Sequence, residues 1–202
     1  MITLHNYEGK NIDIAKDKCL TELNVREKDV YFAEKQCDNS LFNKKVEIIA
    51  ITKKEIIDNI KAYIKELSKN MGININSEIR INEQSVNVLL VSDNNNILIG
   101  KDGKTLNAIQ IVIRQAMKEL NQFGLKILVD VSNYKQRKIK NLESEIKTIC
   151  EEVLNSKVEV KLDPMNSFER RTVHSIVTEF ENLESISFGE EPERYTVIKY
   201  KD

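Results

Sequence analysis

Two glycines three positions apart, in Gly100-Lys101-Asp102-Gly103, constrain the fold of this chain more than any other stretch. Apolar residues 97–99 precede them, and apolar residues at helical spacing follow: Leu106, Ile109, Ile113, Met117 and Leu120. The glycines therefore lie between two helical segments. Because glycine has no Cβ, another backbone can approach closely, and the amide groups that open the second helix present the positive end of its dipole. This combination predicts a loop that binds phosphate.

A nucleotide-binding P-loop is the first alternative, because Gly103-Lys104-Thr105 resembles the end of that motif. The motif requires a glycine five positions before Gly103, where this chain has Leu98. The apolar residues 97–99 cannot wrap phosphates as the missing loop would. An NTPase is therefore the weakest of the functions considered, and we expect neither an enzyme nor a cofactor.

The residues around the loop predict a defined order of elements. An amphipathic helix spans residues 53–71, strands follow near 73–81 and 86–90, and another strand follows the second helix at 125–131. This order resembles that of a type II KH domain, whose Gly-x-x-Gly loop clamps the backbone of about four single-stranded nucleotides. The resemblance implies that seven consecutive residues contact nucleic acid: Ile99, Gly100, Lys101, Asp102, Gly103, Lys104 and Thr105. Lys101 and Lys104 would add positive charge to this contact, and Asp102 would point away from the ligand.

The chain after residue 133 contains a second candidate surface. A helix is expected over residues 134–154 and a strand over 158–162, and Asn166 with Glu169 predicts a capped helix that runs to about residue 180. Strands are expected at 183–188 and 195–200. Arg170 and His174 are four residues apart and share a helix face, a pattern also compatible with a surface arginine beside a partly buried histidine.

The whole run 164–174, together with Gly189-Glu190-Glu191-Pro192, resembles the arginine-three-histidine (R-3-H) domain, a binder of single-stranded nucleic acid. The resemblance implies that Arg170 contacts phosphate or stacks on a base and that His174 supports it by hydrogen bonding, with Arg171 beside them. Basic residues on the preceding helix either form a solvated face or bridge the two domains along one RNA strand. They are Lys135, Arg137 and Lys138, followed by Lys140.

A KH domain followed directly by an R-3-H domain resembles the bacterial Jag family, also known as the KhpB or EloR family. That family has a small strand-helix-strand-strand domain at its N-terminus, which begins with a Gly-Lys pair such as Gly9-Lys10. The sequence predicts such a unit here, with a strand near 2–7, a helix at 12–23 and strands at 30–33 and 46–51. The segment 37–45 departs from the glycine-rich Lys-Lys-Gly-Phe-Leu-Gly pattern that the family usually has there.

The resemblance implies a cytoplasmic, post-transcriptional RNA-binding protein linked to cell elongation, cell division and the cell envelope. The partners it implies are a small single-KH protein and, through the N-terminal domain, membrane-associated elongation proteins. The fold class expected is α+β with three small domains: a βαββ unit at 1–53, a type II KH-like αββααβ domain at 54–132 and an α/β R-3-H-like domain at 133–202.

The charge balance limits how this chain can bind nucleic acid. The net charge is −1 over the 202 residues, and no third of the chain is strongly basic, so binding depends on local patches. This balance favours a second hypothesis, a protein-interaction scaffold with a vestigial loop.

The sequence also favours a cytoplasmic protein without membrane insertion. It has three widely spaced cysteines, no long apolar run and an N-terminus without an apolar signal core. The choice between RNA and single-stranded DNA stays open.

Overall fold

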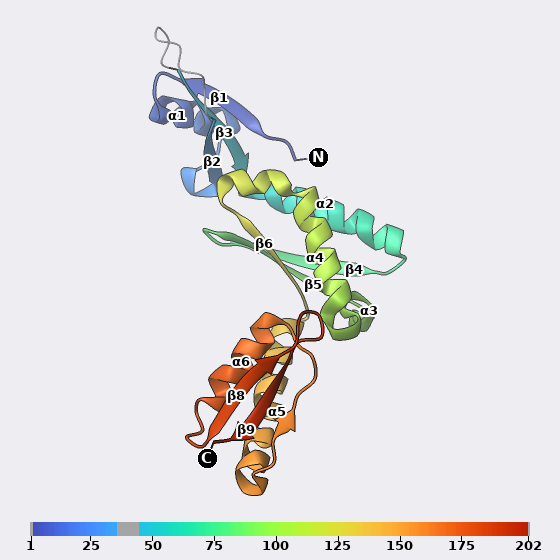
Figure 1. The fold of residues 1–202 in the computed structure, drawn as a ribbon. Helices are drawn as coiled ribbons and strands as arrows, with labels where there is room; N and C mark the ends of the chain where they lie inside the picture. The colour runs from blue at the N-terminus through green and yellow to red at the C-terminus, as the bar shows by residue number, and fades with distance from the viewer. Residues whose placement is uncertain (1, 36–44, 202) are drawn as a thin grey trace. The chain divides into compact units, whose positions relative to one another are not determined.

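Three sheets, each of three strands, organise the part of the chain that the structure describes, residues 2–35 and 45–201 of a computed structural model. The chain divides into two compact units, Met1–Ser132 and Asn133–Asp202 (Figure 1). The first unit contains two of the sheets and the second contains one. The expected fold class, α+β with several domains, is therefore confirmed.

The N-terminal sheet has the order β1-β3-β2, and all of its pairings are antiparallel. Its elements are β1 (His5–Gly9), α1 (Ile12–Leu23), β2 (Val30–Lys35) and β3 (Val46–Thr52). The Asn11 side chain caps α1 by accepting the Ile14 N–H. One face of α1 buries Ala15 and Cys19 against the sheet. The prediction about the segment 37–45 lies, apart from Lys45, outside the described residues.

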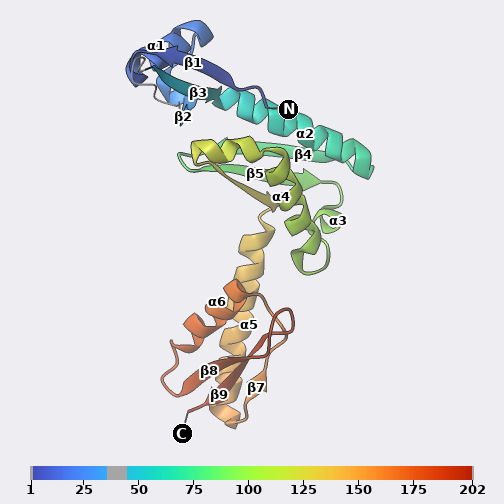
Figure 2. The ribbon, with the colours of Figure 1, turned by 45° about the horizontal axis from the view of Figure 1, so that its top comes forward.

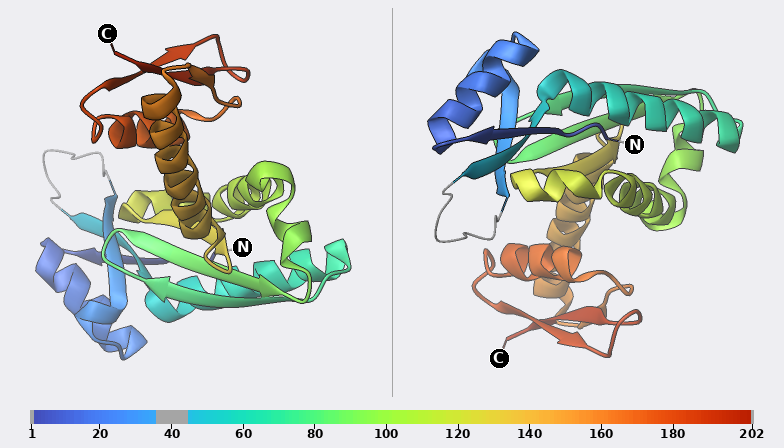
Figure 3. Two further views of the ribbon diagram at one scale, coloured as in Figure 1. Left: turned by 90° about the horizontal axis from the view of Figure 1, so that it is seen from below. Right: turned by 90° about the horizontal axis from the view of Figure 1, so that it is seen from above.

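The second sheet of this unit, of order β4-β5-β6, carries the glycine loop. Helix α2 (Lys53–Met71) precedes it, and the strands are β4 (Ile75–Ile81), β5 (Ser85–Ser92) and β6 (Lys126–Val131). The β4–β5 pair is antiparallel and the β5–β6 pair is parallel. Strands β4 and β5 lie in front of α2 when seen from below and behind it when seen from above (Figure 3).

Helices α3 (Asn95–Ile99) and α4 (Lys104–Ala116) connect β5 to β6 along the chain and meet at the glycine loop (Figure 2). Both α2 and α4 bury isoleucines at helical spacing, and one face of the sheet is buried beneath them. The helix after the loop is shorter than the apolar spacing predicts. Met117 leaves the helical conformation, and a 3₁₀ helix, η3 (Lys118–Phe123), then turns Leu120 into the core.

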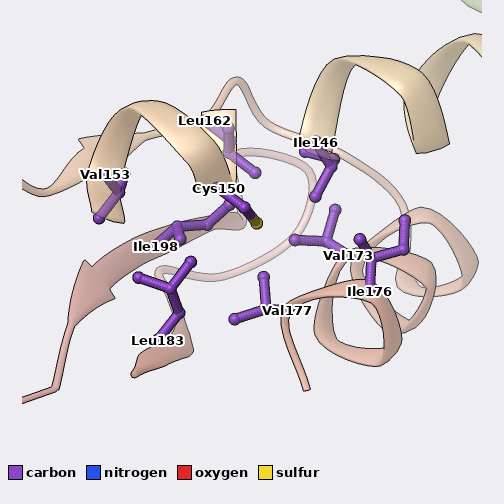
Figure 4. Close-up of a cluster of buried hydrophobic side chains, with 9 residues drawn as sticks. All are labelled: Ile146, Cys150, Val153, Leu162, Val173, Ile176, Val177, Leu183 and Ile198. Atoms are coloured by element: carbon purple, nitrogen blue, oxygen red, sulfur yellow. The ribbon is translucent and has the colours of Figure 1, made fainter. Parts of the chain in front are cut away.

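The second unit packs two helices on one face of a sheet of order β7-β9-β8. Its elements are α5 (Tyr134–Ser156), β7 (Val160–Lys161), α6 (Ser167–Val177), β8 (Leu183–Phe188) and β9 (Tyr195–Tyr200). Nine buried residues form the core, with Cys150 among the aliphatic side chains of both helices (Figure 4). Strand β7 is shorter than predicted. Helix α6 ends at Val177 rather than near residue 180, because the backbone after Val177 closes in short turns.

No helix within the described residues is both long enough and apolar enough to cross a membrane. The cysteines of the described part, Cys19 and Cys150, are buried free thiols.

The capping box of α6 yields a stability prediction. Asn166 Oδ1 accepts the N–H groups of Phe168 and Glu169, both at 3.0 Å, and Glu169 returns a bond to the Asn166 N–H. We expect Asn166→Ala to lower the free energy of unfolding by about 1 kcal/mol in urea denaturation, because two helix amides lose their acceptor. The exposed Ser175→Ala on the same helix is the control, and an equal loss from both substitutions would contradict the capping role.

Candidate nucleic-acid interface

The loop between α3 and α4 depends on an unusual backbone conformation. Gly100 has φ 69° and ψ −177°, Asp102 has φ 55°, and Gly103 has φ 84°. The Gly100 conformation is essentially restricted to glycine. A Cβ on Gly100 would also overlap the side chain of Thr105. The buried residues Leu98 and Ile99 anchor the loop on the α3 side, so the sequence places a fixed turn here.

The start of α4 has no side-chain cap, and its first amide, the Lys104 N–H, donates to the Lys101 carbonyl of the loop. Gly103 occupies the N-cap position and makes no side-chain cap, and the first turn of α4 has no acidic residue. No carboxylate in the first turn of α4 therefore offsets the positive end of the helix dipole. Lys101 and Lys104 are exposed beside this helix end, and neither forms an ion pair within the described residues. Asp102 is also exposed, so its predicted orientation away from a ligand stays a prediction.

Two α4 side chains that sequence reasoning missed attach this helix to the edge of β6. Gln110 Oε1 accepts the Val129 N–H at 3.1 Å, and Arg114 Nε donates to the Ile127 carbonyl at 2.8 Å. Their spacing of four residues on one helix was the available signal. Because the edge of β6 is bonded to these side chains, α4 and the loop at its start are held rigidly to the sheet.

Arg170 lies inside the second unit rather than on its surface. Its side chain is only 9% exposed, Nη1 donates to the Met165 carbonyl at 2.8 Å, and Nη2 pairs with Glu191 Oε1 at 3.2 Å. The guanidinium therefore ties the start of α6 to the segment between β8 and β9. This geometry makes Arg170 a positioning residue, and its direct contact with nucleic acid stays a prediction.

His174 is bound on both ring nitrogens. Nδ1 lies 2.6 Å from Ser185 Oγ and Nε2 lies 2.9 Å from Ser187 Oγ, and Ser187 Oγ in turn lies 3.1 Å from the buried Thr196 hydroxyl. Burial lowers the pKa of His174 below the usual 6.5, and the charges of Arg170 and Arg194 lower this pKa further. The ring is therefore held neutral at pH 7 and joins α6 to β8, which agrees with a supporting role.

The other basic residues predicted to bind nucleic acid in the second unit differ in solvent exposure. Arg171 and Arg137 are exposed, whereas Lys135 and Lys138 are half-buried. Lys138 Nζ also pairs with Glu169 Oε1 at 2.6 Å, between α5 and α6. Each unit thus carries its own group of candidate residues. The described residues contain no group of three or more His, Cys, Asp and Glu side chains that could hold a metal ion.

The Gly100 geometry predicts a loop-specific effect. Gly100→Ala and Gly72→Ala both place a Cβ at positive φ, but nothing lies within 4 Å of the new Cβ at position 72. We expect Gly72→Ala to lower the free energy of unfolding by about 1–2 kcal/mol and Gly100→Ala to lower it by more, with faster hydrogen exchange at the α3 and α4 amides. Equal losses in urea denaturation would refute the overlap with Thr105.

The lowered pKa of His174 predicts a pH dependence of stability. The unfolded chain takes up a proton near pH 6.5 and the folded chain only at lower pH, so protonation favours unfolding as the pH falls through this window. We expect wild type to lose more stability than the non-titrating His174→Gln variant between about pH 7.5 and about pH 5.5 in urea denaturation. All other titrating groups are shared, so parallel pH profiles would contradict the assignment.

Comparison with known proteins bears on both groups of residues. The family described as "KhpA/KhpB, KH domain" matches residues 57–129, and the R-3-H domain family matches residues 140–200. A Clostridium symbiosum protein named "RNA-binding protein KhpB" is 29% identical over 199 residues, which cover 96% of this chain and 90% of that protein. The Bacillus subtilis protein of the same name is 26% identical over 200 residues, 96% of each chain. The Streptococcus pneumoniae protein of that name is 24% identical over 144 residues, 71% of this chain and 44% of its own length.

The two matches follow the order that the sequence predicts: the KH match lies in the first compact unit and the R-3-H match lies in the second. Each match contains one of the two candidate groups: the glycine loop lies in the first, and Arg170 with His174 lies in the second. Together with relatives that align over nearly the full chain, these matches confirm the KH and R-3-H domains and the resemblance to the bacterial Jag (KhpB) family.

Proposed function

We propose that this chain is a non-enzymatic protein that binds single-stranded RNA through the glycine loop and through the exposed cations of the second unit. The observation that carries the proposal is the start of α4, where a helix N-terminus without a side-chain cap, two exposed lysines and a glycine backbone meet. A phosphate at this position gains several N–H donors at once. The relatives named RNA-binding proteins support RNA as the ligand.

The two groups have different tasks in this proposal. In the first unit the backbone itself clamps phosphates, and Lys101 and Lys104 add long-range attraction. In the second unit Arg170 and His174 hold α6 against β8 and the following segment, and the exposed Arg171 and Arg137 make the contacts with the strand. Because the contacts are made to phosphates by cations, added salt weakens binding.

The biological role proposed follows from the resemblance to the Jag (KhpB) family. We assign the chain a cytoplasmic, post-transcriptional role linked to cell elongation, division and the envelope, with a small single-KH protein and membrane-associated elongation proteins as partners. The domain division proposed is 1–53, 54–132 and 133–202. It is supported by the three sheets, each of which lies within one of these ranges.

The test replaces the loop lysines while leaving its backbone intact. Lys101→Ala/Lys104→Ala is compared with Lys61→Ala/Lys65→Ala, which removes the same charge from the exposed face of α2. In fluorescence anisotropy with a single-stranded RNA, the loop variant should bind more weakly and lower the slope of log K against log salt by about 1.4, since each phosphate contact contributes about 0.7. The α2 variant should bind as wild type does.

The same assay separates the competing functions. Equal binding by both variants would overturn the loop as the RNA site. Failure of wild type to bind any single strand, combined with recovery of proteins in a pull-down after nuclease treatment, would instead favour the scaffold hypothesis that the near-neutral charge suggests. A DNA oligonucleotide of the same sequence tests whether the 2′-hydroxyl is recognised.

A further inference from the structure

Within the described part of the second unit, the sheet has one face that neither helix covers. Helices α5 and α6 pack against the face that carries Leu183 and Ile198 (Figure 4). Successive side chains of a strand point to opposite faces, so the residues between these two positions form the other face, here called the outer face. Its apolar members on β8 and β9 are Ile186, Phe188, Tyr195 and Val197. The function proposed above does not use this face.

An aromatic pair lies at one end of the outer face. Phe188 and Tyr195 are directly opposite each other on β8 and β9, and their ring centroids are 6.0 Å apart with the planes tilted by 32°. Phe188 is 45% exposed although it is one of the largest apolar side chains of the unit. Exposed aromatic rings on a sheet are the surface on which sheet-based RNA-binding domains stack bases.

Two cations flank the aromatic pair. The Lys161 ammonium lies 4.1 Å from the centroid of the Tyr195 ring, and the pairing of β7 with β9 places Lys161 on the outer face. Arg194 directly precedes Tyr195 and is exposed. Neither cation forms an ion pair within the described residues, whereas Lys199, farther along β9, pairs with Glu184 at 3.0 Å. The cations without a carboxylate partner are therefore the ones beside the rings.

The turn between β8 and β9 decides which part of a nucleotide the outer face can hold. It contains the exposed carboxylates Glu190 and Glu193, which repel phosphate. Stacking of a base on a ring requires no net positive charge, and every base has a π-face that can stack. The exposed ring of Phe188 therefore fits a base, and Lys161 and Arg194 fit the phosphates next to that base.

The same turn connects the outer face to the arginine and histidine of α6. Glu191 pairs with Arg170 at 3.2 Å, and Ser187 on β8 lies 2.9 Å from His174 Nε2. The charge of Arg194 is close enough to lower the pKa of His174. Strand β8 is an edge strand of the sheet, so a nucleic-acid strand that contacts α6 reaches the outer face around this edge. These contacts also hold the ends of β8 and β9 in place.

We propose that the Phe188–Tyr195 pair is a base-stacking site for the same single strand that the exposed cations of the second unit bind, with Lys161 and Arg194 contacting the phosphates beside the stacked base. This inference rests on the proposed function. A ring face has no donors or acceptors for base edges, so the site accepts every base and does not read sequence. It adds an uncharged contribution to binding by a chain of near-zero net charge.

The test uses the full chain and exploits the absence of tryptophan from its sequence. Phe188→Trp keeps a ring at the site and adds a fluorophore whose emission changes when a base stacks on it. Phe188→Leu keeps an apolar side chain and removes the ring. Ile186→Ala removes apolar surface from the same face and is the control. Each variant is mixed with a single-stranded RNA and with an abasic strand of the same length, which has the phosphates but no bases.

Phe188→Leu should bind the RNA at least about fivefold more weakly than wild type, the loss expected when one stacked base loses its ring. The slope of log K against log salt should stay unchanged, because no phosphate contact is removed. The abasic strand should bind this variant and wild type equally. Phe188→Trp should keep the RNA affinity, and its emission should respond to the RNA and not to the abasic strand. Ile186→Ala should bind both strands as wild type does.

Equal RNA binding by Phe188→Leu and wild type would overturn the stacking site, and this is also the outcome expected if the outer face binds a protein instead. Equal weakening by Phe188→Leu and Ile186→Ala would overturn it as well, because apolar area rather than a ring would then matter. In both cases weaker binding by Lys101→Ala/Lys104→Ala leaves the proposed function intact. Failure of wild type to bind any single strand overturns both proposals.

Discussion

The joint between α3 and α4 depends on the backbone of Gly100, and the rest of the first unit is arranged around this joint. A residue with a Cβ cannot hold φ 69° and ψ −177° beside Thr105 without overlap. Burial of Leu98 and Ile99 before the turn, and of Leu106 after it, fixes both helices on the sheet. The start of α4 therefore has no side-chain cap, and the turn that the structure requires also creates the candidate phosphate site.

The second unit uses its polar motif in a different way. Arg170 and His174 direct their hydrogen bonds to Met165, Glu191, Ser185 and Ser187, all within the same unit. A buried cation is stable only when its donors are satisfied, and here a carbonyl and a carboxylate satisfy it. The Arg-x-x-x-His spacing is thus explained by the need to hold α6 against β8 and the following segment. Exposed neighbours such as Arg171 are then the groups that can meet a ligand directly.

Local charge matters more than total charge in this molecule. The chain has a net charge of −1, yet the first unit places exposed lysines at the start of α4. At physiological ionic strength charges act over about 8 Å, so this cluster acts on a phosphate near it and the distant acidic residues contribute little. The salt dependence of binding is therefore the measurement that reports such a local cluster.

The sequence by itself determined the elements that depend on neighbours in the chain. The helices at 12–23 and 53–71 and the strands at 183–188 and 195–200 match prediction, because apolar period and caps such as Asn166 act within a few residues. Only the tertiary structure decided which polar side chains are buried against partners and which stay exposed to solvent. The burial of Arg170 depends on Glu191, twenty-one residues away, and the hydrogen bond from Arg114 to the Ile127 carbonyl joins α4 to β6 across thirteen residues. Such contacts join segments that no local pattern relates, so periodicity could not reveal them.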